Sequence, residues 1–210
     1  MKRAYQYSVA AQVWVLREFG EVGPRTFGAL IAHFGNLAAI LEAEEDELRK
    51  ISGLGEVKSR KISESFRALG RADEFINSLK EREIGVATIF DTDYPPHFRE
   101  LNDPPPIIFY RGKLPGDGEK TVAIVGSHNA TNEGIQNAVQ LSGKLAAHSV
   151  SVVSGLARGI DTAAHIGALK AGGKSYAILG SGFDHIHPEE NRPLAVELVN
   201  SGALISEYPP

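Results

Sequence analysis

The sequence has no cysteine among its 210 residues, and its apolar runs are short. Without cysteine, the chain can form no disulfide scaffold, no thiolate metal site and no cysteine nucleophile. The longest apolar runs, such as Thr121–Val125, are far shorter than the roughly 20 residues of a membrane-spanning helix. Residues 1–10 also lack the apolar segment of a secretory signal. We therefore expect a cytoplasmic protein that does not enter a membrane.

Charge of neither sign dominates the chain. The 22 lysines and arginines are set against 26 aspartates and glutamates, which gives a formal net charge of −4. This balance excludes a protein that is basic throughout, but it leaves room for a local basic patch. Residues 49–71 are such a patch, because they contain seven basic and two acidic side chains. A charge run of this kind is also typical of an ordinary solvated helix face.

The first 80 or so residues predict helices that are interrupted by two glycine-containing turns. Apolar residues recur at three- and four-residue spacing in Val9–Leu16 and in Phe27–Phe34. The turns are Gly20–Pro24 and Ser52–Gly55. A shift of the sequence by 32 residues places four residues of the first copy on identical residues of the second. These pairs are Leu16 and Leu48, Arg17 and Arg49, Gly23 and Gly55, and Phe34 and Phe66. We interpret them as an internal duplication of a helix, a hairpin and a helix.

The second copy resembles the helix-hairpin-helix motif. A tight glycine turn leaves backbone N–H groups free at the start of the next helix, where the helix dipole favours a phosphate. Three basic residues follow the turn, so the sequence predicts a secondary DNA contact at Gly53, Gly55, Lys58, Arg60 and Lys61. The alternative is that the hairpins only join antiparallel helices, in which case this domain is a structural cap.

From Gly85 onward, short β-like runs alternate with helical patterns. The predicted strands are Val86–Phe90, Ile107–Tyr110, Thr121–Val125, Val150–Val153, Ser175–Leu179 and Ala203–Ile205, and the predicted helices are Glu133–His148, Asp161–Ala171 and Pro193–Asn200. This alternation indicates an α/β fold with a Rossmann-like parallel sheet. We therefore expect a helical domain over residues 1–82 and a Rossmann-like domain over residues 83–210.

Small residues follow most of the later strands. In an open parallel sheet, ligands bind beyond the carboxyl ends of the strands, and loops of glycine and serine let the backbone approach a phosphate. We predict phosphate contacts at Gly126, Ser127, His128, Asn129, Ser154, Gly155, Leu156, Ala157, Arg158, Gly159, Gly180, Ser181, Gly182 and Phe183. The dinucleotide fingerprint and the P-loop signature are both absent from these loops.

Longer blocks of the sequence resemble the DNA-processing protein A family (DprA, also called Smf). They are Asp93–Pro95, Pro105–Gly112, Thr121–Ser127, Val152–Leu169 and Ile205–Pro209, and the helical start is similar to the family's SAM-like helix-hairpin-helix domain. The resemblance implies a bacterial protein that binds and protects single-stranded DNA and loads RecA recombinase during natural transformation. It also implies a homodimer, no cofactor, no metal and no catalysis. Residues 126–128 take the place of the family's Gly-Ser-Arg loop.

Two departures from the family pattern affect these expectations. His128 stands where the family has arginine, and a histidine is mostly neutral at pH 7. We expect weaker DNA binding as a result, particularly above pH 7, with Arg158 compensating in part. The sequence also stops at Pro210, before a Phe-Pro-x-Arg-Asn-Arg block and further strands of the family. We expect an incomplete sheet with an exposed apolar edge, self-association and a weakened or lost dimer.

Two other functions remain open at this point. Related Rossmann-like enzymes, the phosphoribohydrolases, cleave nucleoside monophosphates with a Pro-Gly-Gly-x-Gly-Thr block, which this sequence lacks. The second alternative is a nucleotide-sensing or protein-interaction module.

Several side chains have both a functional and a structural interpretation. Asp161 and His165 are spaced as an acid–base pair, but a helix cap and a packed histidine are the interpretation that we favour. Phe183 either stacks on a base or packs in the core. A cluster at His185, His187, Glu189 and Glu190 has metal-binding residue types, and we interpret it as a solvated loop.

Overall fold

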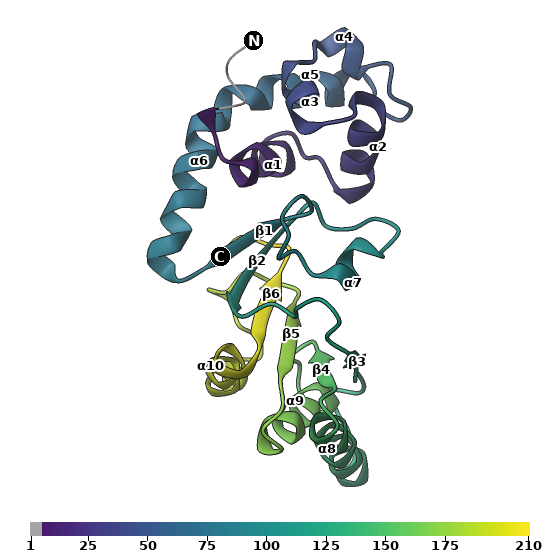
Figure 1. Cartoon of the computed structure of the whole chain (residues 1–210), viewed down its shortest axis with the longest axis vertical. Helices are drawn as coiled ribbons and strands as arrows, with labels where there is room; N and C mark the ends of the chain where they lie inside the picture. The colour runs from purple at the N-terminus through teal and green to yellow at the C-terminus, as the bar shows by residue number, and fades with distance from the viewer. Residues whose placement is uncertain (1–5) are drawn as a thin grey trace. The chain divides into compact units, whose positions relative to one another are not determined.

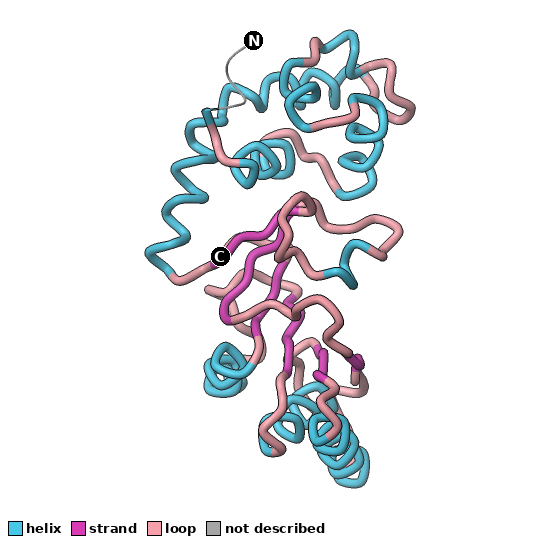
Figure 2. Tube along the Cα trace, in the orientation of Figure 1, coloured by secondary structure: helices cyan, strands magenta, loops and turns pink. Residues whose placement is uncertain are grey.

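The computed structural model describes residues 6–210, which form two compact units that divide after Ile107 (Figure 1). The first unit consists mainly of helices, whereas the second contains most of the strands together with three longer helices (Figure 2). The predicted combination of a helical part and an α/β part is therefore confirmed.

The helices of the first unit pack around α1, in which residues 11–16 are all buried. They are α1 (Val9–Glu18), α2 (Pro24–Phe34), α3 (Leu37–Glu42), α4 (Glu45–Leu48), α5 (Glu56–Ser65) and α6 (Leu69–Ser78), with short 3₁₀ turns at Phe66–Ala68 and Leu79–Arg82. Helix α1 packs against α6, where Trp14 stacks on Phe75 with ring centroids 5.1 Å apart. Ser8 caps α1 through its side chain, which accepts from the N–H of Ala11.

The predicted duplication is visible in the backbone of this unit. Gly23 and Gly55 precede α2 and α5 with almost the same dihedral angles, φ −76°, ψ 172° and φ −77°, ψ 172°. Neither helix start has a side-chain cap. The Lys58 ammonium donates to Thr26 Oγ1 at 2.9 Å, and these two residues are themselves 32 positions apart. The two hairpins thus contact each other at equivalent positions of the repeat.

The segment between the helices and the second unit packs with the helical core. Helical structure ends at Arg82, and β1 (Gly85–Thr88) follows. The Phe27 and Phe90 rings lie 6.1 Å apart, which helps to explain why the compact unit extends to Ile107. Within the segment, α7 (Pro96–Arg99) is held near Asp91 by its arginine. The domain boundary expected after residue 82 stays a prediction.

The sheet of the second unit is mixed. Its strands are β2 (Ile107–Gly112), β3 (Thr121–Ala123), β4 (Ser151–Ser154), β5 (Ser175–Leu179) and β6 (Ala203–Ser206), in the spatial order β2-β6-β5-β4-β3. Strands β3 to β6 are parallel, as predicted, but β2 runs antiparallel to β6. An antiparallel strand needs no crossover helix, and none lies between β2 and β3.

Three helices cover one face of this sheet: α8 (Asn132–Ala147), α9 (Ile160–Lys170) and α10 (Arg192–Ser201). Each connects two neighbouring parallel strands, and right-handed crossovers place all three on the same side. The core between them is apolar, with Ile124 and Val152 packed against Ala164 and Ala168. Gly167 lets α8 and α9 approach closely, because a Cβ there would lie 2.1 Å from Ser142 Oγ.

The opposite face of the sheet exposes apolar side chains. Val125 is 72% exposed and Ile178 is 38% exposed. Both residues alternate with helix-facing neighbours along their strands, since side chains of a strand point to opposite faces. These side chains lie on a face of the sheet, whereas the sequence led us to expect an exposed apolar edge, so that edge and self-association through it stay predictions.

Candidate functional site

Four loops lie side by side at the carboxyl edge of the sheet, because β3, β4, β5 and β6 are parallel neighbours. We call them the loop rim, which consists of residues 126–131, 154–159, 180–184 and 206–209. All the predicted phosphate-binding residues fall on the rim. Their side chains and N–H groups differ, however, in whether they face solvent or the protein.

The first two loops of the rim are in direct backbone contact. Gly159 has φ +75°, and a Cβ there would lie 2.2 Å from the carbonyl oxygen of Ser127. The N–H of Ile160 donates to the same carbonyl at 3.3 Å. Only glycine fits at position 159, since both the dihedral angle and the space exclude a side chain. The contact brings Ser127 and His128 next to the start of α9.

Two predicted donors of the second loop are used inside the protein. The Ser154 hydroxyl is buried and donates to the carbonyl of Ile124 at 2.7 Å. The N–H of Gly155 donates to Asp161 Oδ2 at 3.0 Å. The prediction that Asp161 caps the helix is therefore wrong. Gly159 is the N-cap of α9, and the Asp161 carboxylate instead accepts a hydrogen bond from the preceding loop. Leu156 is also fully buried, so the Ser154 hydroxyl, the Gly155 N–H and the Leu156 side chain are not available to a ligand.

The exposed polar side chains of the rim are those of the first loop and Arg158, together with Asp184, Glu207 and Tyr208 in the third and fourth loops. Ser127, His128 and Asn129 are all exposed, and the N–H of Asn129 donates to Ser127 Oγ at 3.2 Å. Arg158 is exposed as well, but its guanidinium makes a two-pronged ion pair with Glu190, with N–O distances of 2.8 and 2.9 Å. Its predicted phosphate-binding group thus has an internal carboxylate as its partner.

The third and fourth loops are joined by hydrogen bonds. Ser206 Oγ donates to the carbonyl of Ser181, and Ser181 Oγ donates to the carbonyl of His185. Gly182 lies so close to Pro209 that a Cβ would overlap its carbonyl oxygen. These contacts bring the two loops together and leave Gly180 exposed at the surface.

The aromatic residue expected on the rim is buried. Phe183 is 5% exposed, and the Arg111 guanidinium lies 5.6 Å from its ring centroid. Its ring is therefore closed to a nucleobase in this structure, in agreement with the core-packing interpretation. Tyr208, which follows β6, is 49% exposed and offers an open aromatic surface at the same edge.

His165 has a structural environment beneath the second loop. Its Nδ1 lies 2.7 Å from Ser175 Oγ, and that hydroxyl donates to the carbonyl of Val152. Burial lowers the pKa of His165 to about 4, with a smaller opposing effect from Asp161. His165 and Asp161 thus have different hydrogen-bond partners, as the structural interpretation requires.

Glu119 was not singled out by the sequence, although it is the most strongly perturbed carboxylate that the structure describes. It precedes β3 and accepts from Ser151 Oγ (2.6 Å), Lys174 Nζ (2.8 Å) and the Tyr176 hydroxyl (2.6 Å). Partial burial opposes its ionisation, but these hydrogen bonds outweigh burial and lower its pKa to about 2. Because it joins the amino ends of the strands, it lies away from the loop rim.

The basic residues of the second helical hairpin all have polar partners. Lys58 donates to Thr26, Arg60 pairs with Glu56 at 3.0 Å, and Lys61 pairs with Glu21. The hairpin itself is open, since Gly53 and Gly55 are exposed. The feature that remains accessible there is the uncapped start of α5.

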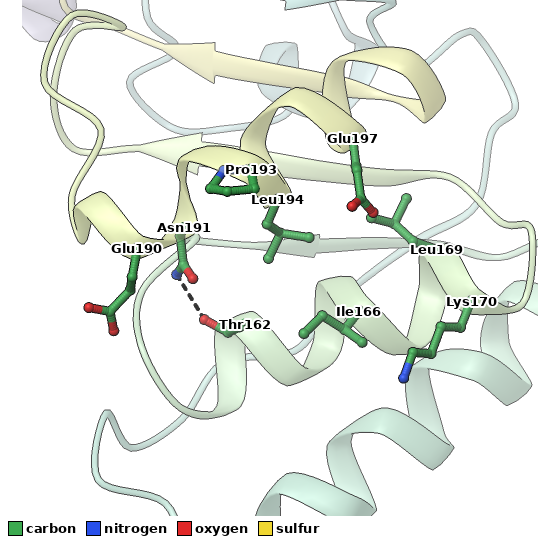
Figure 3. A pocket seen from close by; sticks show the side chains of 9 residues that line it. All are labelled: Thr162, Ile166, Leu169, Lys170, Glu190, Asn191, Pro193, Leu194 and Glu197. Atoms are coloured by element: carbon green, nitrogen blue, oxygen red, sulfur yellow. Dashed lines mark hydrogen bonds between the residues drawn. The ribbon is translucent and has the colours of Figure 1, made fainter.

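A hollow of about 520 Å³ lies between α9 and α10 (Figure 3). Ile166, Leu169 and Leu194 supply apolar side chains to it, while Glu190 and Asn191 lie at one end. Asn191 Nδ2 donates to Thr162 Oγ1 at 2.9 Å across this end. No sequence motif predicts the hollow, because its lining comes from two helices that meet only in the folded chain.

Residues 6–210 contain neither a grouping of metal-binding side chains nor a membrane-spanning helix. In that part of the chain, no three histidine, aspartate or glutamate side chains are grouped to hold a metal ion. None of its helices has the length and apolar character needed to cross a membrane.

Comparison with known proteins agrees with this architecture. The sequence model of the family described as DNA recombination-mediator protein A matches residues 85–210, and that of the SAM-like helix-hairpin-helix tandem matches residues 16–68. The chain belongs to the DNA recombination-mediator protein A family. The resemblance inferred from the sequence blocks is therefore confirmed, as is the helix-hairpin-helix character of the first unit.

Individual relatives show how much of the family the chain covers. The Smf protein of Synechocystis is 33% identical over 192 residues, which are 90% of this chain and 48% of that protein. The crystal structure of DprA from Streptococcus pneumoniae matches with a TM-score of 0.77 and 25% identity, over 97% of this chain and 69% of that one. A DprA structure from Helicobacter pylori, described by its single-stranded DNA binding mode, matches with a TM-score of 0.50 and 28% identity, over 60% of this chain and 56% of that one. The chain thus spans about half the length of the curated relatives it matches.

Proposed function

We propose that this member of the recombination-mediator family binds single-stranded DNA along the loop rim, without sequence preference. The observation that carries the proposal is the backbone contact between the first two loops, which places Ser127, His128 and Arg158 at one exposed edge. The Helicobacter pylori relative, whose structure is described by its binding of single-stranded DNA, supports the choice of ligand.

The chemistry of the rim suits a phosphate backbone. Ser127 and Asn129 offer neutral donors, His128 adds a ring N–H donor, and Arg158 offers a planar fork of donors. At Gly180 nothing lies within 4 Å of the position that a Cβ would take, so a sugar–phosphate chain can approach the protein backbone there. None of these groups reads a base edge, so the contacts position the strand without selecting its sequence.

The helix-hairpin-helix tandem supplies a second, weaker contact in this proposal. The exposed start of α5 at Gly55 presents backbone N–H groups, which favour a phosphate. Lys58, Arg60 and Lys61 already have polar partners, so they would have to exchange those partners to reach DNA. We therefore assign most of the affinity to the loop rim.

The wider role that we propose follows from the relatives. The chain would act in the cytoplasm on DNA taken up during natural transformation, protect the single strand and deliver it to RecA recombinase. It would do so without catalysis or a cofactor, and as a homodimer if the rest of the family's sheet is present. The named DNA-processing proteins of Streptococcus pneumoniae and Bacillus subtilis support the connection to DNA processing.

The proposal is tested by fluorescence anisotropy of a labelled oligo-dT strand. We expect salt-sensitive binding, because contacts with the phosphate backbone release condensed counterions. The paired substitution of Ser127 and His128 by alanine should reduce affinity about tenfold, as expected for the loss of two phosphate contacts of about 0.7 kcal/mol each.

The matched control uses the same residue types away from the rim. His148 and Ser149 are exposed at the end of α8 and precede β4, so they lie at the amino edge of the sheet. Their replacement by alanine should leave the affinity unchanged. Equal losses in the two paired variants, or no binding by the folded wild-type chain at low salt, would refute the assignment of the rim.

A further inference from the structure

In the ion pair between Arg158 and Glu190, the guanidinium holds the carboxylate with the geometry in which it would bind a phosphate. Arg158 donates through Nε to Glu190 Oε1 at 2.8 Å and through Nη2 to Oε2 at 2.9 Å. A guanidinium presents the same parallel donors to two oxygens of a phosphate. Both side chains are 59% exposed, so solvent reaches the pair from outside. The carboxylate of Glu190 thus holds the Arg158 donors that a DNA phosphate would use.

A separate set of contacts holds Glu190 in this position. The next residue, Asn191, is buried and donates from Nδ2 to the carbonyl of Leu156 and to Thr162 Oγ1, each at 2.9 Å. Thr162 in turn donates to the carbonyl of Ala157. The 3₁₀ turn Glu189–Asn191 is therefore attached to the second loop by groups other than the ion pair. Loss of the Glu190 charge should leave this attachment intact.

We propose that Glu190 acts as an internal competitor of DNA phosphate for Arg158, and so sets the affinity of the loop rim. This inference rests on the proposed function. In the free protein, the Glu190 carboxylate pairs with the Arg158 guanidinium. When DNA binds, a phosphate replaces this carboxylate, which then turns to solvent. The hydrogen bond from Arg158 also lowers the pKa of Glu190, which keeps the competitor ionised at neutral pH.

The exchange is feasible because the pair is exposed. Solvent screens such pairs strongly, and they contribute little to stability, so their rupture is a small cost for an incoming phosphate. The competition should nevertheless be measurable. Its removal should raise the affinity for a single strand roughly two- to fivefold, the range expected for an exposed ion pair.

The neighbouring glutamate provides a matched control. Glu189 makes only a long contact with Arg192, 3.7 Å between Oε1 and Nε, and its side chain is 85% exposed. The change Glu189→Gln removes one negative charge from the same turn without freeing Arg158. The experiment compares oligo-dT binding by wild type, Glu190→Gln, Glu189→Gln, Arg158→Ala and the double variant Arg158→Ala with Glu190→Gln, at several salt concentrations. Thermal unfolding of each variant monitors the fold.

The competition model predicts a gain in affinity for Glu190→Gln that is larger than any gain for Glu189→Gln and that disappears in the Arg158→Ala background. Equal gains in the two glutamine variants would overturn it, because they would reflect net charge alone. A gain that persists without Arg158 would overturn it as well. If neither the wild-type chain nor any variant binds the strand, the proposed function itself fails. Binding by wild type with no effect of Glu190→Gln would reject only the competition.

Discussion

The carboxylate of Glu119 stabilises the amino end of the sheet, and its replacement tests that role. It receives hydrogen bonds from Ser151 of β4 and from Tyr176 of β5, and Lys174 pairs with it just before β5. The change Glu119→Gln keeps the size of the side chain but removes its charge. We expect the second unit to lose stability at neutral pH, because these donors favour an ionised acceptor.

The size of the effect follows from the perturbed pKa. Hydrogen bonds lower the pKa of Glu119 from 4.5 to about 2 despite the opposing effect of burial. At about 1.4 kcal/mol per pKa unit, the full shift corresponds to roughly 3.5 kcal/mol of stability. Solvent screening reduces this value, since the Lys174 side chain that pairs with Glu119 is 53% exposed. We therefore expect a loss of about 1–2 kcal/mol in the free energy of unfolding at pH 7.

The effect also has a defined pH window. Below pH 4.5 the unfolded chain takes up a proton at Glu119, whereas the folded chain stays ionised down to about pH 2. The stabilisation is thus fully present above pH 4.5 and is lost as the pH falls to about 2. The difference between wild type and Glu119→Gln should shrink over the same range. His165, whose pKa burial lowers to about 4, titrates in both proteins and cancels from this difference.

Urea unfolding followed by circular dichroism, at pH values from 7 to 2.5, measures this difference. Glu207→Gln is the control, since Glu207 is exposed in the same unit. The reasoning is refuted if Glu119→Gln unfolds at the same urea concentration as wild type at pH 7. It is also refuted if the difference between the two proteins stays constant down to pH 2.5. Binding of DNA at pH 7 should be unaffected, because Glu119 lies away from the loop rim.

Three further predictions concern the binding surfaces. Gly159→Ala should lower oligo-dT affinity at least tenfold and reduce the melting temperature, because its Cβ would lie 2.2 Å from a backbone oxygen of the first loop; wild-type values of both would contradict the loop contact. Replacing Lys58, Arg60 and Lys61 together by alanine should weaken binding less than threefold and lower the salt slope by less than one, since all three have internal partners; a larger loss would move the main contact to the hairpin. Tyr208→Ala should weaken binding about five- to tenfold, because its exposed ring offers a surface on which a base stacks. Quenching of tyrosine fluorescence during a titration with DNA checks this stacking. An unchanged affinity of Tyr208→Ala would exclude it.

Local patterns in the sequence were enough to predict most elements and their order. The strands after Gly85 and the three longer helices lie within a few residues of their predicted ranges, because period-two and period-3.6 patterns reflect one buried face. The duplication was visible as a 32-residue shift, and it reappears in the matching dihedral angles of Gly23 and Gly55. The four loops could be placed at one edge, because parallel strands end on the same side.

The availability of individual groups depended on contacts between distant segments. Gly155 and Ser154 looked like free donors, but Asp161 and the carbonyl of Ile124 accept their hydrogens inside the protein. Burial of Phe183 depends on packing near Arg111, which lies 72 residues earlier in the chain. Such pairings carry no local period or spacing that a reader of the sequence can detect.

The chain's motifs and composition were therefore sufficient for its family and its fold class, and they also placed the four loops at one end of the sheet. Strand order, the antiparallel direction of β2 and the partner of each charged side chain emerged only in the folded molecule. The ion pair of Arg158 with Glu190 shows the physical reason, since it joins residues 32 positions apart through a turn that Asn191 attaches to the second loop. Local sequence sets what each segment can form, and tertiary packing selects which of its polar groups remain free to act.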